Sequence, residues 1–335
     1  MGAKLSSSSS GFSKIKGIKI NRDSSSSSNS ATSSTISTNK SRTQKTQQIL
    51  TNEQQLPSPR TSSTTSFDTR ELPYATLKTE DDRMNANQFA LKALFGGNYL
   101  EQVSKHIDFN SANTKVLDIG CGAGGWVMDM ATEHPAAQFI GLDKVRLFPK
   151  TIRPANVSFE QRDVTLGLPY KDNTFDLVHM RLFLMAFNKF DYDECLKEVY
   201  RVTKPNGIFQ LMEVEMIDDG DEVIRTFGAH MDRIMTANDQ DALIARRLPA
   251  IMSESGFTPI QEVRQSIPLN NHPLAAEFLY IFDITFDTVK KIVFAVYDLS
   301  TEEEYQELKR KWLESRKNSS NSTWWCAAGQ KKVEN

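Results

Sequence analysis

A glycine-rich loop follows a short apolar run at residues 115–119 and opens a helical pattern. The loop reads Gly120-Cys121-Gly122-Ala-Gly-Gly125. Glycines at such a strand-to-helix junction permit a tight turn and let backbone N–H groups approach a ligand closely. The spacing satisfies both G-x-G-x-G and G-x-G-x-x-G, so it fits two classes of nucleotide cofactor. A tight turn without any ligand is the third interpretation.

Aspartates follow the next two predicted strands. Asp143 closes the run 138–142, where a carboxylate can accept both hydroxyls of a ribose. Asp163 comes directly after the run 157–161, where it could accept an adenine amino group while the Val164 N–H meets a ring nitrogen. An aspartate at a strand end is also a common turn cap, so that alternative stays open for Asp163.

Strand and helix patterns alternate through the middle of the chain. The expected strands cover residues 115–119, 138–142, 157–161, 175–180, 208–214, 260–267 and 323–328. Helical patterns cover residues 80–105 (with a break at Gly96-Gly97), 126–133, 193–203, 221–255 and 301–317. This alternation predicts an α/β fold with a parallel, doubly wound sheet and right-handed crossovers.

The first 70 residues differ from the rest in composition. They are rich in Ser, Thr and Lys, with few large apolar side chains, so we expect a disordered tail. The start, Met1-Gly2-Ala-Lys-Leu-Ser6, fits the N-myristoylation pattern, and basic residues follow it. An acyl chain on Gly2 together with a basic patch would give peripheral membrane association. A plain soluble tail and a mitochondrial presequence are the alternatives.

Charge and cysteine content exclude several classes of protein. Residues 1–60 carry a net charge of about +7 and the remainder about −9, which disfavours nonspecific binding to nucleic acid. The three cysteines, Cys121, Cys195 and Cys326, lack C-x-x-C spacing, so neither a metal site nor a disulfide framework is predicted. No apolar run reaches the roughly 18–20 residues that span a bilayer. We therefore predict a cytoplasmic protein, with membrane association through Gly2 as the variant.

Taken as a set, these motifs resemble class I methyltransferases that use S-adenosylmethionine. Phe175–Val178 matches the fourth strand of that family, and Lys204–Gly207 matches the turn before its fifth strand. The resemblance covers about residues 80–330 and implies a domain over 71–335. It also implies a Rossmann-like sheet of seven strands, the last antiparallel. Residues 83–98 and 324–331 further resemble fungal methyltransferases related to secondary-metabolism regulators, although Phe89 stands where that group often has His.

The resemblance assigns roles to particular residues. Its cofactor-binding set is Asp118, Gly120, Cys121, Gly122, Asp143, Asp163, Val164 and Arg181. Asp118 would orient backbone N–H groups and the cofactor's ammonium. Arg181 would pair with the methionine carboxylate or with a substrate, and a solvated arginine is its alternative.

Methyl transfer is an in-line displacement that needs no metal, and its main requirement is alignment. A base is needed only for a poor nucleophile; His179 is the candidate, with a packed structural histidine as the alternative. A helical insert at about 215–255, with the helix before Gly96, is expected to cap the pocket. Apolar residues there could line an acceptor site or simply form core: Met212, Met216, Phe227, Met231 and Met235.

Three functions remain open from the sequence. The leading one is a methyltransferase that acts on a small-molecule or protein acceptor. The second is a cofactor-binding regulator with weak or no catalysis, and the third is a nicotinamide oxidoreductase. The cofactor residues are compatible with the first two alike.

Overall fold

A computed structural model describes residues 78–217 and 219–332. The predictions for the tail, including Gly2, lie outside these residues. Seven strands form one sheet: β1 (Lys115–Ile119), β2 (Gln138–Asp143), β3 (Val157–Gln161), β4 (Phe175–Arg181), β5 (Thr203–Val214), β6 (Phe257–Pro268) and β7 (Asn321–Lys331). The four strands β1, β2, β3 and β4 begin and end within one residue of their predicted bounds.

The strand order is β3-β2-β1-β4-β5-β7-β6. Strands β1 to β5 pair in parallel, and β7 pairs antiparallel with β5 and β6. This topology confirms the predicted Rossmann-like sheet with an antiparallel last strand. The order reverses at β1, which has β2 on one side and β4 on the other, and ligands of doubly wound sheets bind at the carboxyl ends of strands at such a switch point.

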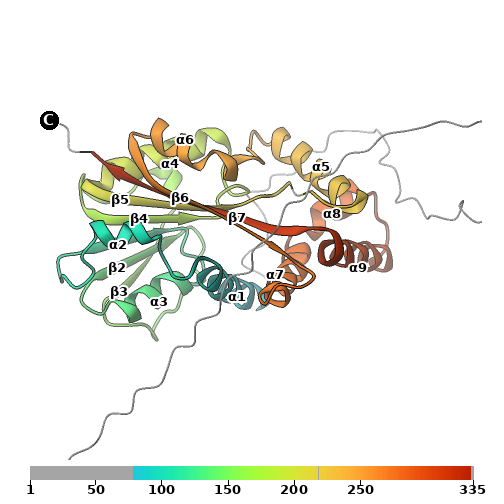
Figure 1. Cartoon of the computed structure of the whole chain (residues 1–335), viewed down its shortest axis with the longest axis horizontal. Coiled ribbons are helices and arrows are strands. Elements are labelled where there is room, and N and C mark those ends of the chain that lie inside the picture. Colours follow the sequence, from blue (N-terminus) through green and yellow to red (C-terminus); the bar gives the residue numbers. More distant parts are fainter. Residues whose placement is uncertain (1–77, 218, 333–335) are drawn as a thin grey trace, which may run out of the picture. The chain divides into compact units, whose positions relative to one another are not determined.

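Helices cover both faces of the sheet (Figure 1). One face packs against α2 (Glu101–His106), α3 (Gly125–Glu133) and parts of α1 (Lys78–Phe95) and α7 (Ala275–Thr288). The other face packs against α4 (Lys189–Val202), the 3-10 turn η3 (Ile244–Arg247) and α6 (Leu248–Glu254). Strands buried on both faces are apolar almost throughout, and for this reason the sequence predicts them well.

The helices beyond the strand ends differ from the predicted cap. Of the insert expected at 215–255, only α5 (Glu222–Ala237) lies there, because η3 and α6 pack onto the sheet through Ile244 and Leu248. The rest of this layer consists of α7, α8 (Lys290–Val296) and α9 (Glu302–Ser319). The first two of these were not predicted. The capping box predicted from Thr301 and Glu304 is present at the start of α9.

Strand β5 begins five residues earlier than predicted, at Thr203. The predicted Pro205-Asn-Gly207 turn is retained as an irregularity within the strand. Thr203 pairs with Phe175 and Ile208 with Leu177, so the residues between them bulge out of the ladder. Asn206 takes a positive φ of 66°, a conformation that asparagine tolerates better than most residues.

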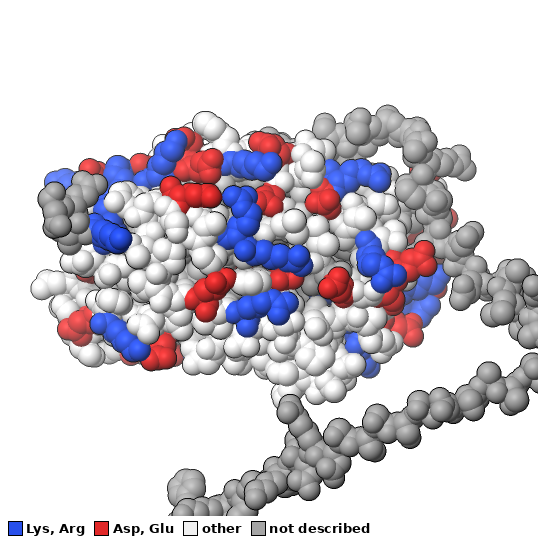
Figure 2. Space-filling view, turned by 45° about the horizontal axis from the view of Figure 1, so that its top comes forward, with Lys and Arg blue, Asp and Glu red and all other residues white. Residues whose placement is uncertain are grey.

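The described residues contain no helix that is both long and apolar enough to cross a membrane. On the face in Figure 2, basic and acidic side chains are interspersed rather than gathered into fields of one sign.

Candidate functional site

A cavity of about 590 Å³ opens at the carboxyl ends of β1, β2 and β4. Seven of the eight predicted cofactor residues line it: Gly120, Cys121, Gly122, Asp143, Asp163, Val164 and Arg181. Asp118 and the candidate base His179 are not among its lining residues. The tertiary structure thus brings together side chains that lie up to 61 positions apart in the chain.

The glycine loop leaves no room for side chains at two positions. Gly120 has φ 69°, and a Cβ there would overlap the ring of Phe183. Gly122 has φ 53°, and a Cβ there would lie 2.7 Å from the Met84 Sδ. The loop is held to β2 by the Gly120 and Cys121 N–H groups, which both donate to the Leu142 carbonyl, at 2.8 and 3.0 Å. The ring of Phe183 excludes a side chain at Gly120, and the positive φ values of Gly120 and Gly122 favour glycine at both positions.

Asp143 supports the loop and also faces the cavity. Its two carboxylate oxygens accept the N–H groups of Gly122 and Val145, each at 2.8 Å. Burial raises the pKa of Asp143 above its ordinary value, against the effect of these two hydrogen bonds. Because both oxygens retain further lone pairs, the carboxylate can still accept hydroxyls from a ligand in the cavity.

Asp163 performs the capping role that the sequence left open. Its Oδ1 accepts the Thr165 N–H at 3.1 Å and the Thr165 hydroxyl at 2.7 Å, which caps the 3-10 turn Val164–Leu166. The other oxygen lies 3.4 Å from the Lys144 Nζ. Both Asp163 and Val164 also line the cavity, so capping and ligand binding are compatible here.

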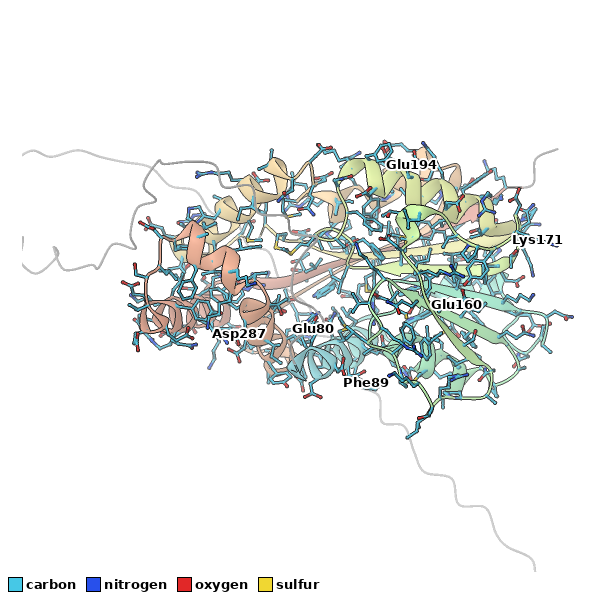
Figure 3. All side chains as sticks on the ribbon, turned by 180° about the vertical axis from the view of Figure 1, so that it is seen from behind. Glu80, Phe89, Glu160, Lys171, Glu194 and Asp287 are labelled. Atoms are coloured by element: carbon cyan, nitrogen blue, oxygen red, sulfur yellow. The ribbon has the colours of Figure 1, made fainter. Side chains whose placement is uncertain are left out.

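Helix α1 forms the wall of the cavity opposite the sheet. Arg181, at the end of β4, donates to the Gln88 Oε1 at 2.7 Å. Helix α1 is tied to α3 by Asp129, whose carboxylate accepts hydrogen bonds from Lys92 at 2.8 Å and Asn98 at 2.8 Å. Phe89 lies on the outer side of α1 (Figure 3) and is 61 % exposed, so it makes no wall of this cavity.

His179 is a packed residue in this structure. Its Nδ1 lies 2.8 Å from the Asp118 Oδ1, and its ring stacks on Trp126 at 4.0 Å between centroids. The side chain is 1 % exposed, and burial lowers the pKa of the imidazole despite the hydrogen bond to Asp118. The geometry favours the structural alternative for His179, and it places Asp118 under the loop as the partner of that ring.

Cys121 is a neutral thiol in the cavity wall. It is 7 % exposed, and burial raises the pKa of its thiol well above the usual range. A thiol that stays protonated is a poor nucleophile, so we assign it no covalent chemistry. Among residues 78–217 and 219–332, no group of three or more His, Cys, Asp or Glu side chains is placed to hold a metal ion.

A second cavity, of about 190 Å³, adjoins the first. The two share three lining residues: Arg83 and Asn87 on α1, and Leu182 directly after β4. The walls of the second cavity come from α5, α7 and α9 and from the ends of β5 and β7. Met216, Phe227 and Met231, which the sequence suggested for an acceptor site, line it, whereas Met212 and Met235 do not.

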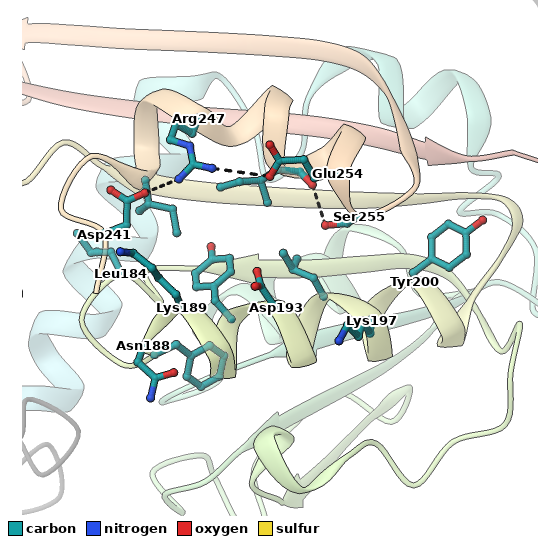
Figure 4. Close-up of a pocket in the computed structure, with 15 residues that line it drawn as sticks. Leu184, Asn188, Lys189, Asp193, Lys197, Tyr200, Asp241, Arg247, Glu254 and Ser255 are labelled. Atoms are coloured by element: carbon teal, nitrogen blue, oxygen red, sulfur yellow. Dashed lines mark hydrogen bonds and ion pairs between the residues drawn. The ribbon is translucent and has the colours of Figure 1, made fainter. Parts of the chain in front are cut away.

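A third hollow, of about 480 Å³, lies between α4 and the segment formed by η3 and α6 (Figure 4). Three of its charged groups pair with one another: Arg247 lies 2.8 Å from Asp241 and 3.7 Å from Glu254. None of the predicted cofactor residues lines it. We therefore place the candidate site in the two adjoining cavities.

Sequence analysis missed the residues of α1 that enclose the site. Arg83, Met84 and Asn87 line the first cavity, and Gln88 holds Arg181. The sequence carries no signal for these roles, because Asn and Gln on a helix are mostly exposed. Only the tertiary structure shows that Asn87 and Gln88 are buried.

Comparisons with known proteins agree with this geometry. Residues 110–254 match a methyltransferase-domain family. The chain is 30 % identical over 137 residues to the secondary metabolism regulator laeA of Coprinopsis cinerea, covering 41 % of this chain and 34 % of that protein. It is 29 % identical over 165 residues to the methyltransferase pytC of Aspergillus terreus, covering 47 % and 50 %.

Residues 110–254 are therefore similar to a methyltransferase domain, and the sheet that they belong to has the Rossmann-like strand order expected for class I methyltransferases. The domain resembles the fungal secondary-metabolism-regulator type in sequence. The chain spans about a third to a half of the length of these curated relatives. Among solved structures it is similar to phosphoethanolamine N-methyltransferase 2 of Haemonchus contortus, with 19 % identity, coverage of 83 % and 62 %, and a TM-score of 0.45.

Proposed function

We propose that the chain binds S-adenosylmethionine in the 590 Å³ cavity and transfers its methyl group to a small-molecule or protein acceptor. One observation carries the proposal: the glycine loop, both strand-end aspartates and Arg181 converge on a single cavity. Its volume lies within the roughly 300–1,000 Å³ of ordinary cofactor and ligand sites. The glycine cradle, which a Cβ would fill, and the half-buried Asp143 match what a nucleoside with a charged amino-acid arm requires.

Within this proposal each residue holds a particular part of the cofactor. Asp143 accepts the ribose hydroxyls, while Asp163 and the Val164 N–H receive the adenine edge. The loop at Gly120–Gly122 and the Arg181 guanidinium meet the methionine arm. Asp118 acts from below, because its contact with His179 fixes the end of β1 from which the loop departs.

The cofactor supplies a methyl group on a positively charged sulfur, which leaves as a neutral thioether. The protein's own work is to align the acceptor and to exclude water. The packing of His179 argues against a histidine base at this site. An acceptor that is already nucleophilic when neutral therefore suits the site best.

Calorimetry of the purified chain with S-adenosylhomocysteine and with NAD tests cofactor choice. We expect saturable binding of the first and none of the second, with binding weakened at least tenfold in Asp143→Ala. Transfer of label from S-adenosylmethionine to components of a fungal extract then tests activity. Binding of NAD alone would overturn the proposal in favour of an oxidoreductase.

A second candidate is a regulator that binds the cofactor with weak or no catalysis. It is supported by the names of relatives such as the regulator LAE1 of Cochliobolus heterostrophus, which is 27 % identical over 168 residues. The labelled extract separates the two candidates. Tight cofactor binding without transfer of label to any component would favour the regulator.

Peripheral membrane association through an acylated Gly2 remains a separate proposal. Only the pattern Met1–Ser6 and the basic residues after it support it. The intact mass of protein expressed in a eukaryotic host checks it, because an acyl chain adds a fixed mass. An unmodified N-terminal peptide would remove the lipid from consideration.

A further inference from the structure

The 190 Å³ cavity beside the proposed cofactor site is walled mostly by apolar side chains. Phe227, Met231 and Phe286 come from the helical layer, and Trp324 comes from β7. A cavity of about 150 Å³ lined by aliphatic and aromatic side chains is large enough for benzene. The cavity therefore fits one aromatic ring with a small substituent and excludes a large or flexible acceptor.

The charged groups in the wall are engaged with protein partners. Arg83 donates two hydrogen bonds to the carboxylate of the buried Glu80, at 2.8 and 2.6 Å. Glu215 accepts hydrogen bonds from Arg246, at 3.0 Å, and from the Trp325 indole. The guanidinium of Arg316 lies over the ring of Phe282, at 4.3 Å. A charged acceptor would find no ready counter-ion here and would lose its hydration on entry.

Asn87 differs from these groups. It is 4 % exposed, it lines both cavities, and its buried Oδ1 has no hydrogen-bond partner among the described residues. A buried acceptor left unpaired is costly, and a ligand that donates a hydrogen bond would satisfy it. The amide therefore marks the point, between the two cavities, where a ligand's N–H or O–H fits.

Among the described residues, the ionisable side chains of the wall are Arg83, Glu215 and Arg316, and none of them is suited to take a proton. Burial alone would raise the pKa of Glu215, but its hydrogen bonds from Arg246 and Trp325 hold that pKa below the ordinary value. A hydroxyl acceptor would need a base that this wall does not provide. A neutral amine carries its own lone pair and needs no such base.

We propose that this cavity is the acceptor site and that it takes a compact, uncharged aromatic amine whose N–H donates to Asn87. The inference rests on the proposed function and names its substrate class. The nitrogen lone pair forms the new bond to the methyl carbon while the carbon–sulfur bond breaks. The electron pair of that bond neutralises the sulfonium, and the extra proton on nitrogen leaves to water.

A larger side chain at Gly228, on α5, offers a way to fill the cavity by substitution. Gly228 lines the cavity in the middle of the helix, and a Cβ there would meet only Ile217, at 3.7 Å. A leucine at this position projects into the cavity without strain in the backbone. Ala229, on the exposed side of the same helix, supplies the matched control Ala229→Leu.

Three probes are titrated into protein loaded with S-adenosylhomocysteine, with calorimetry as the readout. They are 4-methylaniline, p-xylene, which lacks the donor, and 4-methylbenzylamine, which is cationic at neutral pH. We expect saturable binding of 4-methylaniline, weaker binding of p-xylene and none of the benzylamine. With labelled S-adenosylmethionine, 4-methylaniline becomes methylated, whereas 4-methylphenol binds and does not react.

Substitutions at two positions, Gly228 and Asn87, test whether 4-methylaniline binds in this cavity. Gly228→Leu should weaken 4-methylaniline binding more than tenfold, and the smaller Gly228→Ala should weaken it less, while Ala229→Leu does not. Asn87→Leu should weaken 4-methylaniline about tenfold, the value of one lost hydrogen bond to a buried group, and leave p-xylene unchanged. Thermal unfolding serves as the folding control in each variant, and S-adenosylhomocysteine affinity is measured beside it.

The outcomes separate the two proposals. Failure to bind S-adenosylhomocysteine overturns the proposed function itself. Normal binding of S-adenosylhomocysteine with no binding of 4-methylaniline, or with binding unaffected by Gly228→Leu, overturns the acceptor site alone. A loss of cofactor affinity in Asn87→Leu with unchanged 4-methylaniline binding would assign Asn87 to the cofactor instead.

Discussion

The two adjoining cavities were built in different ways. The proposed cofactor cavity is formed by short loops at the ends of neighbouring parallel strands, so its residues carry local signals such as glycine spacing and an aspartate after an apolar run. The proposed acceptor cavity is assembled from α1, α5, α7 and α9 and from the far ends of β5 and β7. The residues of a site that depends on backbone conformation could be predicted from short sequence motifs. The residues of a pocket made by helix packing could not.

The difference has a consequence for tolerance to substitution. The cofactor cavity depends on backbone positions that permit no side chain, and the acceptor cavity depends on apolar volume that can be changed gradually. Substitutions in the first should therefore act abruptly and those in the second in proportion to size. Four experiments test this contrast.

Gly120→Ala should have the largest effect. Its Cβ would overlap the ring of Phe183, and its φ of 69° disfavours any side chain. We expect a loss of roughly 3–5 kcal/mol of unfolding free energy, from overpacking together with the left-handed conformation. Cofactor affinity should fall below detection. Urea unfolding and calorimetry measure both, and Gly97→Ala, where a Cβ has only one neighbour at 3.8 Å, is the control. Equal tolerance of both variants would contradict the contrast.

Glu213→Gln tests the buried support of the first cavity, because Glu213 on β5 holds the backbone of Phe183, which lines that cavity. Burial raises the pKa of Glu213 to about 8 in the folded protein, and its Oε1 accepts the Phe183 N–H at 2.8 Å. The folded state binds the proton of Glu213 more tightly than the unfolded state does, and this difference stabilises the fold. The stabilisation is complete below pH 4.5 and is lost as pH rises through 8. At about 1.4 kcal/mol per pKa unit, the loss over that window is about 5 kcal/mol.

Unfolding free energies at acidic, neutral and alkaline pH check this expectation. The Gln variant should lack that part of the pH dependence, since its amide does not titrate. The exposed Glu262→Gln serves as a control that keeps the wild-type slope. The same slope in all three proteins would show that Glu213 is not responsible for it.

Asp129→Asn should have a smaller effect, because it weakens the anchoring of α1, the wall common to both cavities. Its carboxylate is 18 % exposed and accepts hydrogen bonds from Lys92 and Asn98. We expect a loss of about 1 kcal/mol of unfolding free energy, with a parallel decrease in cofactor affinity. Thermal unfolding with and without S-adenosylhomocysteine measures it. Glu101→Gln, in an exposed pair with Lys105, should change neither quantity.

Gly228→Ala should have the smallest effect and the opposite sign. Alanine is favoured over glycine in a helix interior, and its Cβ meets only ordinary contacts at Ile217. We expect a gain of about 0.5–1 kcal/mol in unfolding free energy. Thermal unfolding detects it. A destabilised variant would mean that the acceptor cavity is as intolerant as the glycine loop, and the contrast would fail.

Much of the fold was predictable because the central strands are buried on both faces and are therefore apolar almost throughout. Helix α7 was missed for a related reason. Its buried residues include Phe278, Ile281, Ile284 and Phe286, and their spacing leaves no single apolar stripe. The insert at 215–255 was assigned to the cap as a whole, because a helical pattern does not show which surface a helix covers.

By itself the sequence determined the α/β sheet, the glycine loop and the aspartates that follow its strands. These features depend on residues close together in the chain and on backbone conformations that few residue types adopt. Only the tertiary structure decided that His179 stacks on Trp126 instead of facing the cavity. It alone placed Asn87 between the two cavities and closed the acceptor site with α7 and α9. Those outcomes depend on which side chains, far apart in the chain, pack against one another. Local residue patterns do not determine such contacts.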